Sequence, residues 1–315
     1  MIIKHNKKTI ELLGDTHLGR SFLHGVPLHR RGDREKMVWA QFEKSLAETK
    51  ADVHVHVGDL FDKAYVPYDC IVRAAITYLK AATEKPATTF IILRGNHDVL
   101  RDLERVSAFD LFTHIVGSQS NIKVVTEKFV LGDVAYFAWQ PVVHAADLVA
   151  GTTGKICVGH WDVTSFGGND ENLIPTKQLA EAGFTHAYTG HIHRADQFDR
   201  DGIDVMVVGS MQPFAHGEES NTDLYITLTK DEIDDTLHDR CVRIILQPDE
   251  ILDEEIDCLQ LTVKKLDGVD EEMPAVVLGD FDMISLFRTA FAEVNPEITE
   301  TLLQQFNLKR LADGS

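Results

Sequence analysis

The sequence has little cysteine and no long apolar run. Its four cysteines (Cys70, Cys157, Cys241 and Cys258) lie far apart and form no Cys-x-x-Cys pair, and Cys157 lies in an apolar run that is typical of a core. No stretch approaches the roughly 18–20 apolar residues that span a bilayer, and "MIIKHNKKTIELLGD" lacks the apolar region of a signal peptide. We therefore expect a reduced, cytoplasmic protein with no membrane partner.

Positive charge is scarce in the last third of the chain. Residues 201–315 hold 8 Lys and Arg against 26 Asp and Glu, whereas residues 1–200 hold 23 against 24. The acidic part would repel nucleic acid and membranes, or await a basic partner. The first fifty residues are locally basic, and "RSFLHGVPLHRRGDR" contains Arg20, Arg30 and Arg31 together with His24 and His29. This segment is either a solvated loop or a contact for a phosphate backbone.

Short apolar runs alternate with helical patterns along the first 240 residues. The runs "TIELLG", "ADVHVHVG", "TTFIILRG", "VAYFAWQ", "KICVGH", "THAYTGH" and "IDVMVVGS" each end at a glycine or a polar turn and predict buried strands. Residues 34–50, 69–85 and 175–183 have the spacing and end signals of helices. The Asp201-Gly202 turn predicts a hairpin. The alternation predicts an α/β layered fold.

The pattern changes after about residue 240. We expect one domain over residues 1–240 and an acidic cap of a few strands over 241–280. Two amphipathic helices joined at Asn295-Pro296 would follow over 281–315. These helices either pack on their own domain or form a small module that docks on another protein.

Polar side chains follow five of the predicted strands. They are Asp15 and His17, then Asp59 and Asp62, then Asn96, His97 and Asp98, then His160, and finally His191 and His193. Ligands bind outside the carboxyl ends of strands in open α/β sheets, so these motifs indicate one shared site. Imidazole and carboxylate ligands without thiolate favour manganese, iron or zinc over calcium. Two such ions would leave net positive charge facing a phosphate, and an ion pair of this kind activates water for attack on phosphorus.

The motifs "GDTHLG", "GDLFD", "GNHD", "GH" and "GHIH" resemble the calcineurin-like metallophosphoesterases. Within that superfamily the chain is most similar to the SbcD-type nuclease subunit of the double-strand-break repair complex, in its compact bacteriophage form. "KICVGHWDVTSFGG" and "VVGSMQPFAHGEES" carry much of this similarity. The resemblance implies an αββα sandwich with a smaller α+β cap and a terminal helical pair. It also implies the cytoplasm of a bacterial or phage-infected cell.

The resemblance assigns roles to these positions. Asp15, His17, Asp59 and His193 would hold one ion, while Asp59, Asn96, His160 and His191 would hold the other, with Asp59 shared and two Mn²⁺ as the usual ions. His97 would act on the phosphate or the leaving oxygen. Asp62 would orient His97, although some nucleases of the family carry another residue there. Asp98 is expected only to close the turn.

Several residues have a structural and a functional interpretation. His54 and His56 are expected to be core histidines, and His56 alternatively supports the metal ligands. Arg20, Arg30 and Arg31 are the candidate substrate contacts, while His24 and His29 belong by default to an exposed loop. Trp139 either packs or lines the substrate groove, and Trp161 either packs or stacks on a base. The helical segments 69–85 and 105–115 lie where the family dimerises.

Three functions compete. The first is a manganese-dependent DNA nuclease, an exonuclease on duplex ends and an endonuclease on single strands, which works with an SMC-like ABC ATPase docked partly on the C-terminal helices. The second is another metallophosphoesterase, such as a phosphatase or cyclic-nucleotide phosphodiesterase. Lys63-Ala64 stands where protein phosphatases usually have Arg-Gly, which counts against that branch. The third is a metal-stabilised scaffold for the ATPase.

Overall fold

The computed structural model describes residues 1–266, except 101, 103–104, 166–169, 219–223 and 254. The helical pair predicted for residues 281–315 and the last part of the predicted cap therefore lie outside the described residues. Among the helices that the structure describes, none combines the length and the apolarity needed to cross a membrane. All four cysteines are buried and free, Cys157 in the core as expected. The cytoplasmic location stays a prediction.

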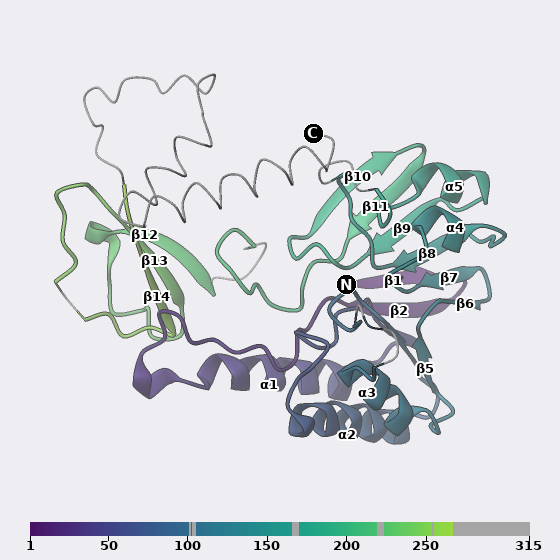
Figure 1. Ribbon diagram of the computed structural model, residues 1–315, viewed down its shortest axis with the longest axis horizontal. Helices are drawn as coiled ribbons and strands as arrows, with labels where there is room; N and C mark the ends of the chain where they lie inside the picture. The colour runs from purple at the N-terminus through teal and green to yellow at the C-terminus, as the bar shows by residue number, and fades with distance from the viewer. Residues whose placement is uncertain (101, 103–104, 166–169, 219–223, 254, 267–315) are drawn as a thin grey trace, which may run out of the picture. The chain divides into compact units, whose positions relative to one another are not determined.

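The first sheet has five strands in the order β1-β2-β3-β4-β5. The strands are β1 (Ile2–His5), β2 (Lys8–Leu13), β3 (Val53–His56), β4 (Thr89–Leu93) and β5 (Ile122–Val125). β1 pairs with β2 in antiparallel fashion, and the other neighbours are parallel. The helices α1 (Asp33–Glu48), α2 (Tyr68–Glu84) and α3 (Ala108–Val116) lie on one side of this sheet (Figure 1).

The second sheet has six strands in the order β10-β11-β9-β8-β7-β6. They are β6 (Lys128–Leu131), β7 (Val134–Phe137), β8 (Ile156–Gly159), β9 (His186–Thr189), β10 (Asp196–Arg200) and β11 (Ile203–Val207). The hairpin β10–β11 turns at Asp201-Gly202, as the sequence predicts. The short helices α4 (Ala145–Val149) and α5 (Thr176–Glu181) pack on the outer side of this sheet.

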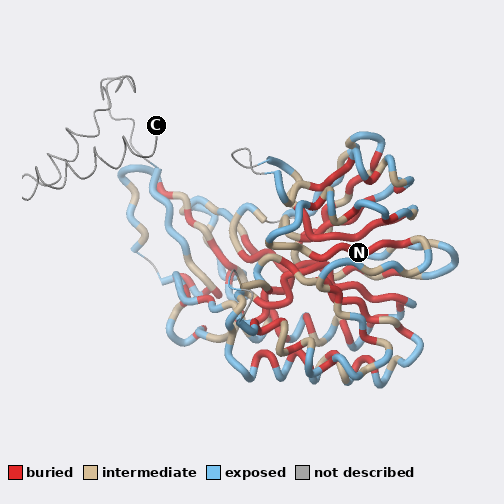
Figure 2. The backbone as a smooth tube through the Cα atoms, turned by 45° about the vertical axis from the view of Figure 1, so that its right-hand side comes forward, coloured by how far each residue is buried: buried red, intermediate tan, exposed pale blue. Residues whose placement is uncertain are grey.

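The two sheets pack face to face, because both faces of their central strands are apolar. In β4, Phe90 and Ile92 point towards the helices, while Ile91 and Leu93 point towards the second sheet. In β7, Tyr136 faces the first sheet and Phe137 faces α4 and α5. Buried residues accordingly run along the strands of both sheets (Figure 2). The α/β layered fold predicted from the alternating pattern is confirmed.

A third sheet contains three parallel strands, β12 (Tyr225–Thr229), β13 (Cys241–Leu246) and β14 (Gln260–Lys265). The 3-10 turns η1 (Leu28–Arg30) and η2 (Lys230–Glu232) complete the described elements. β12 precedes the boundary predicted at residue 240 and pairs with β13, which follows it. The boundaries themselves stay a prediction.

Candidate metal centre

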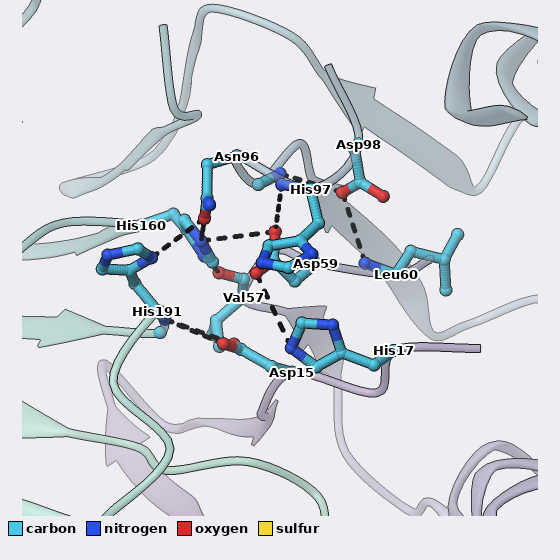
Figure 3. Close-up of polar contacts among 12 residues, drawn as sticks. Asp15, His17, Val57, Asp59, Leu60, Asn96, His97, Asp98, His160 and His191 are labelled. Carbon is cyan, nitrogen blue, oxygen red and sulfur yellow. Dashed lines mark hydrogen bonds and ion pairs between the residues drawn. The ribbon is translucent and has the colours of Figure 1, made fainter. Parts of the chain in front are cut away.

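The loops after β2, β3, β4, β8 and β9 bring the predicted ligands to one place (Figure 3). Three of these ligands have a left-handed backbone, with φ of 44° at His17, 52° at Asp59 and 74° at His191. Such conformations are costly for residues other than glycine and persist where the surrounding structure fixes them, which is common at functional sites.

Glycine allows the loops to approach one another closely. A Cβ on Gly95 would lie 2.1 Å from Oδ1 of Asp59, and a Cβ on Gly58 would lie 2.2 Å from Nδ1 of His160. Either side chain would collide with a predicted ligand. The glycines before the ligands in the motifs therefore have a steric reason.

The first group of ligands consists of Asp15, His17 and His193, whose ligand atoms all lie within 4.8 Å of one another. Nε2 of His17 and Nε2 of His193 are 2.9 Å apart. Nε2 of His193 also lies 3.8 Å from Oδ2 of Asp15. Two imidazole nitrogens and a carboxylate oxygen thus face the same point.

The second group consists of Asp59, Asn96, His160 and His191. Oδ1 of Asn96 lies 2.9 Å from Nε2 of His160 and 2.9 Å from Nδ1 of His191. Nε2 of His160 is 3.5 Å from Oδ1 of Asp59. Figure 3 shows these side chains converging on Asn96 and Asp59.

Asp59 lies between the two groups. Its Oδ1 faces His160 of the second group, and its Oδ2 lies 3.7 Å from Nε2 of His17 in the first group. One carboxylate oxygen is therefore available to each group, which is the arrangement that a shared ligand requires.

The charge distribution of the centre fits cations. Asp15 is fully buried and Asp59 is 1% exposed, and histidines are the charged side chains beside these carboxylates among the described residues. Two buried carboxylates are costly unless cations neutralise them. Divalent ions of borderline softness suit the oxygen and imidazole donors present here. The residues therefore fit a two-ion centre.

The pKa values follow from burial and proximity. Burial raises the pKa of Asp15 to about 6 and lowers the pKa of His17 to about 2, so His17 is neutral and has a lone pair available. Burial alone would raise the pKa of Asp59, but His160 beside it holds that pKa below its usual range. Burial opposes protonation of His160, yet Asp59 raises the pKa of His160 to about 9.

The second-group histidines use their outer ring nitrogens in hydrogen bonds. Nδ1 of His160 donates to the carbonyl oxygen of Val57 at 2.9 Å. Nε2 of His191 lies 2.7 Å from Oδ1 of Asp162. Such contacts orient a metal-binding histidine and raise its basicity.

The first-group histidines have carboxylates on their outer side. Nδ1 of His193 lies 3.1 Å from Oε1 of Glu218, whereas Nδ1 of His17 is 3.7 Å from Oδ1 of Asp62. Glu218 and Asp162 were not among the predicted site residues. The segments "KICVGHWDVTSFGG" and "VVGSMQPFAHGEES" contain Asp162 and Glu218, but the resemblance assigned neither residue a role. The spacing of Asp162 two residues after His160 is a further usable signal.

His97 lies at the mouth of the centre and is exposed. Its backbone N–H donates to Oδ1 of Asp59 at 2.9 Å, and its ring Nδ1 donates to the backbone carbonyl of Asp62 at 2.6 Å. The contact with Asp62 therefore exists, but through its carbonyl group. The Asp62 carboxylate instead lies 3.6 Å from Nη1 of Arg20 and 3.7 Å from His17.

Asp98 closes the turn, which is the role expected for it. Its buried carboxylate accepts hydrogen bonds from the backbone N–H groups of Gly95, Leu60 and Phe61. It thereby joins the loop after β4 to the loop after β3.

The three candidate substrate arginines have different surroundings. Arg20 lies beside the centre, with its guanidinium 5.0 Å from the Phe214 ring. Arg30 is not placed against the ligand groups. Its buried guanidinium contacts Asp33, Asp239 and Asp257 and links η1 to the region before β14, a structural role. Arg31 is exposed, and its contact with DNA stays a prediction, as does that of Arg20.

The remaining candidates are mostly structural. His54 and His56 are buried, and Nε2 of His56 lies 3.0 Å from Oγ1 of Thr16. Trp161 is 1% exposed and packs against Phe137, so packing rather than base stacking is confirmed for it. The backbone N–H of Trp139 donates to the carbonyl oxygen of Arg94. His24 and His29 are exposed.

One of three comparisons with known proteins, the family match, supports this centre. No curated protein matches the chain. Among solved structures, the phosphopantetheinyl hydrolase PptH from Mycobacterium tuberculosis is similar over 64% of this chain and 89% of its own, with 11% identity and a TM-score of 0.36. The family described as calcineurin-like phosphoesterase matches residues 9–195, which is more than half of the chain and includes every ligand named above. The chain therefore belongs to the calcineurin-like phosphoesterase family, whose members are metal-dependent hydrolases.

Proposed function

We propose that this protein is an SbcD-type DNA nuclease that hydrolyses phosphodiester bonds with two Mn²⁺ ions. The observation that carries the proposal is the position of Asp59 between two histidine-containing groups, with the exposed His97 beside it. Asp15, His17, Asp59 and His193 would hold one ion, and Asp59, Asn96, His160 and His191 the other. When bound, the ions supply a water nucleophile at neutral pH and positive charge for the phosphate oxygens.

His97 is positioned to act on the substrate. A carbonyl oxygen only accepts, so the contact with Asp62 requires the proton of His97 on Nδ1. Nε2 of the neutral ring then carries the lone pair, and the protonated ring offers an Nε2–H. That group would donate to a phosphate oxygen or to the leaving oxygen. The backbone bond to Asp59 fixes His97 relative to the centre.

Replacement of His97 tests this role. We expect His97→Ala to lower cleavage of linear DNA with Mn²⁺ by about 10²–10⁴-fold, the usual contribution of a general acid or base. Manganese content, measured on the same preparation, should be unchanged, because His97 belongs to neither proposed ligand set. His114→Ala, at an exposed position of α3, is the matched control. Full activity of His97→Ala would remove the assigned role.

Partners form a separate part of the proposal. We propose an SMC-like ABC ATPase partner that docks on the C-terminal segment, which lies outside the described residues. We also propose a homodimer. α2 exposes Val72 and Ile76 beside a hollow of about 500 Å³ between α1 and α2, and an apolar surface of this kind suits a subunit contact.

Another metallophosphoesterase activity is equally consistent with the family and the centre. One assay separates the two. Purified protein is incubated with Mn²⁺ and linear or single-stranded DNA, with and without the ATPase, beside bis-p-nitrophenyl phosphate. DNA cleavage supports the nuclease. Hydrolysis of the small ester with DNA intact in both conditions favours the alternative, and no hydrolysis at all favours a scaffold.

A further inference from the structure

A hollow of about 510 Å³ opens directly beside His97. Its wall consists of the loop after β2, with Arg20 and Ser21, and the loop after β3, with Asp62, Lys63 and Tyr65. The phosphate of a bound ester would contact the ligand groups and His97. The hollow therefore offers additional surface to the groups esterified to the scissile phosphate.

Tyr65 presents an aromatic ring to this hollow. Its side chain is 51% exposed, and the Arg105 guanidinium lies 5.3 Å from the ring centroid. The residues before and after Tyr65 both contact the rest of the domain. The carbonyl of Ala64 accepts a hydrogen bond of 2.7 Å from Ala108 at the start of α3, and Val66 packs on the core between the helices and the first sheet. The ring is thus positioned by its neighbours while much of its surface stays open.

The hollow also has cationic side chains. Arg20 is held by Asp62 and the Phe214 ring, and Lys63 is exposed on the same wall. Positive groups beside an aromatic ring form the combination that binds single-stranded nucleic acid, because cations contact the backbone while bases stack on the ring.

We propose that this hollow is a nucleotide subsite, in which the base next to the scissile phosphate stacks on Tyr65 and Lys63 contacts an adjacent phosphate. The inference rests on the proposed nuclease function and names its substrate as an unpaired strand. It also explains how the protein would favour nucleic acid over bis-p-nitrophenyl phosphate, since that ester has no adjacent phosphate for Lys63 and no strand that holds its rings against Tyr65.

The test compares Tyr65→Ala with Tyr65→Phe. We expect Tyr65→Ala to lower kcat/KM on a single-stranded oligonucleotide by roughly tenfold, as the loss of one stacked base does, and to leave hydrolysis of bis-p-nitrophenyl phosphate within about twofold, since the proposed ligand sets are unchanged. Tyr65→Phe keeps the aromatic face and should behave as the wild type. Tyr68→Ala is the control, because Tyr68 is 79% exposed and lies outside the hollow.

Binding gives a readout that is independent of turnover. Fluorescence anisotropy with the same labelled oligonucleotide, in His97→Ala protein to prevent cleavage, should show weaker binding after Tyr65→Ala. Lys63→Gln should reduce the slope of log K against log[salt] by about 0.7, the value for one phosphate contact on a single strand.

The outcomes separate the two proposals. If the wild type cleaves DNA and Tyr65→Ala binds and cleaves it equally well, the subsite is overturned and the nuclease stands. If the wild type hydrolyses the small ester but leaves DNA intact with and without the ATPase, both proposals are overturned. If Tyr65→Ala loses activity on the oligonucleotide and the small ester alike, the ring supports the centre and the subsite is overturned.

Discussion

The first and second groups of the metal centre contain the same kinds of side chain but are supported differently. In the second group both histidines have an outer partner within 3.0 Å, namely the Val57 carbonyl for His160 and Asp162 for His191. In the first group His193 has Glu218 at 3.1 Å, while Nδ1 of His17 is buried with no hydrogen-bond partner among the described residues.

The difference reflects which parts of the chain supply the support. Val57 directly follows β3, and Asp162 follows β8 by three residues, so both partners of the second group lie next to sheet strands. Glu218 lies well beyond the end of β11, in a loop whose Met211 N–H donates to the Asp15 carbonyl. Since outer partners set the orientation and basicity of a metal ligand, we expect the second group to bind its ion more tightly.

Asp59 is the one side chain on which both groups depend, so its replacement should have the largest effect. We expect Asp59→Asn to lower affinity at both groups and activity by more than about 100-fold, because removing a shared ligand exceeds the loss of an outer partner. Metal content by mass spectrometry and the rate on bis-p-nitrophenyl phosphate check this. Asp147→Asn, on the exposed surface of α4, is the control, and normal metal content in Asp59→Asn would show that neither group depends on Asp59.

Asp162→Asn and Glu218→Gln should separate the two groups. Each removes an outer carboxylate and keeps its size, so we expect a loss of about 10–100-fold in affinity for one ion only. Manganese titration followed by electron paramagnetic resonance would resolve the two binding steps. Asp162→Asn should weaken the tighter step and Glu218→Gln the weaker step, if the groups differ as their contacts indicate.

Two results would contradict this prediction. Glu218→Gln could affect the tighter step, which would reverse the order of the two groups. Alternatively, both variants could weaken both steps equally, and the centre would then bind its ions as one unit. Glu181→Gln, at an exposed position at the end of α5, controls for a general effect of charge.

The ligands could be predicted from the sequence because each follows a strand. Parallel neighbours bring the loops after β2, β3 and β4 to one edge, and those after β8 and β9 to another. The periodicity of apolar residues was therefore sufficient to predict that Asp15, Asp59 and Asn96 converge. The same pattern could not predict which oxygen of Asp62 accepts the hydrogen bond from His97, because that depends on one backbone rotation.

Contacts between segments that are distant in the sequence could not be predicted, because no local sequence pattern indicates them. Arg30 has the appearance of a DNA contact within its basic loop, yet its partners Asp239 and Asp257 are more than 200 residues away. Glu218 is likewise separated from His193 by a hairpin and a loop. The strands β1, β5, β6 and β12 were not predicted, because none of them forms a clear apolar run that ends at a polar turn.

His54 is a buried histidine outside both ligand groups, and its replacement should have the smallest effect of the changes considered. His54 is 1% exposed, and neither ring nitrogen has a hydrogen-bond partner among the described residues. Burial, and to a lesser extent the N-terminal ammonium group, lowers the pKa of His54 to about 3. Between that value and about 6.5 the unfolded chain binds the additional proton, so the free energy of unfolding falls as the pH drops, by about 1.4 kcal/mol per pH unit for this group.

His54→Leu should remove this acid sensitivity. At pH 5 the variant should gain about 2 kcal/mol relative to the wild type, from the pKa difference. At pH 7.5 it should be neutral or slightly more stable, because it no longer buries unpaired polar atoms. Urea unfolding at both pH values measures this, with His114→Leu as the exposed control. A variant that loses stability equally at both pH values would contradict this prediction. It would show that His54 makes a stabilising hydrogen bond in the core, as the outer nitrogens of the second-group histidines do.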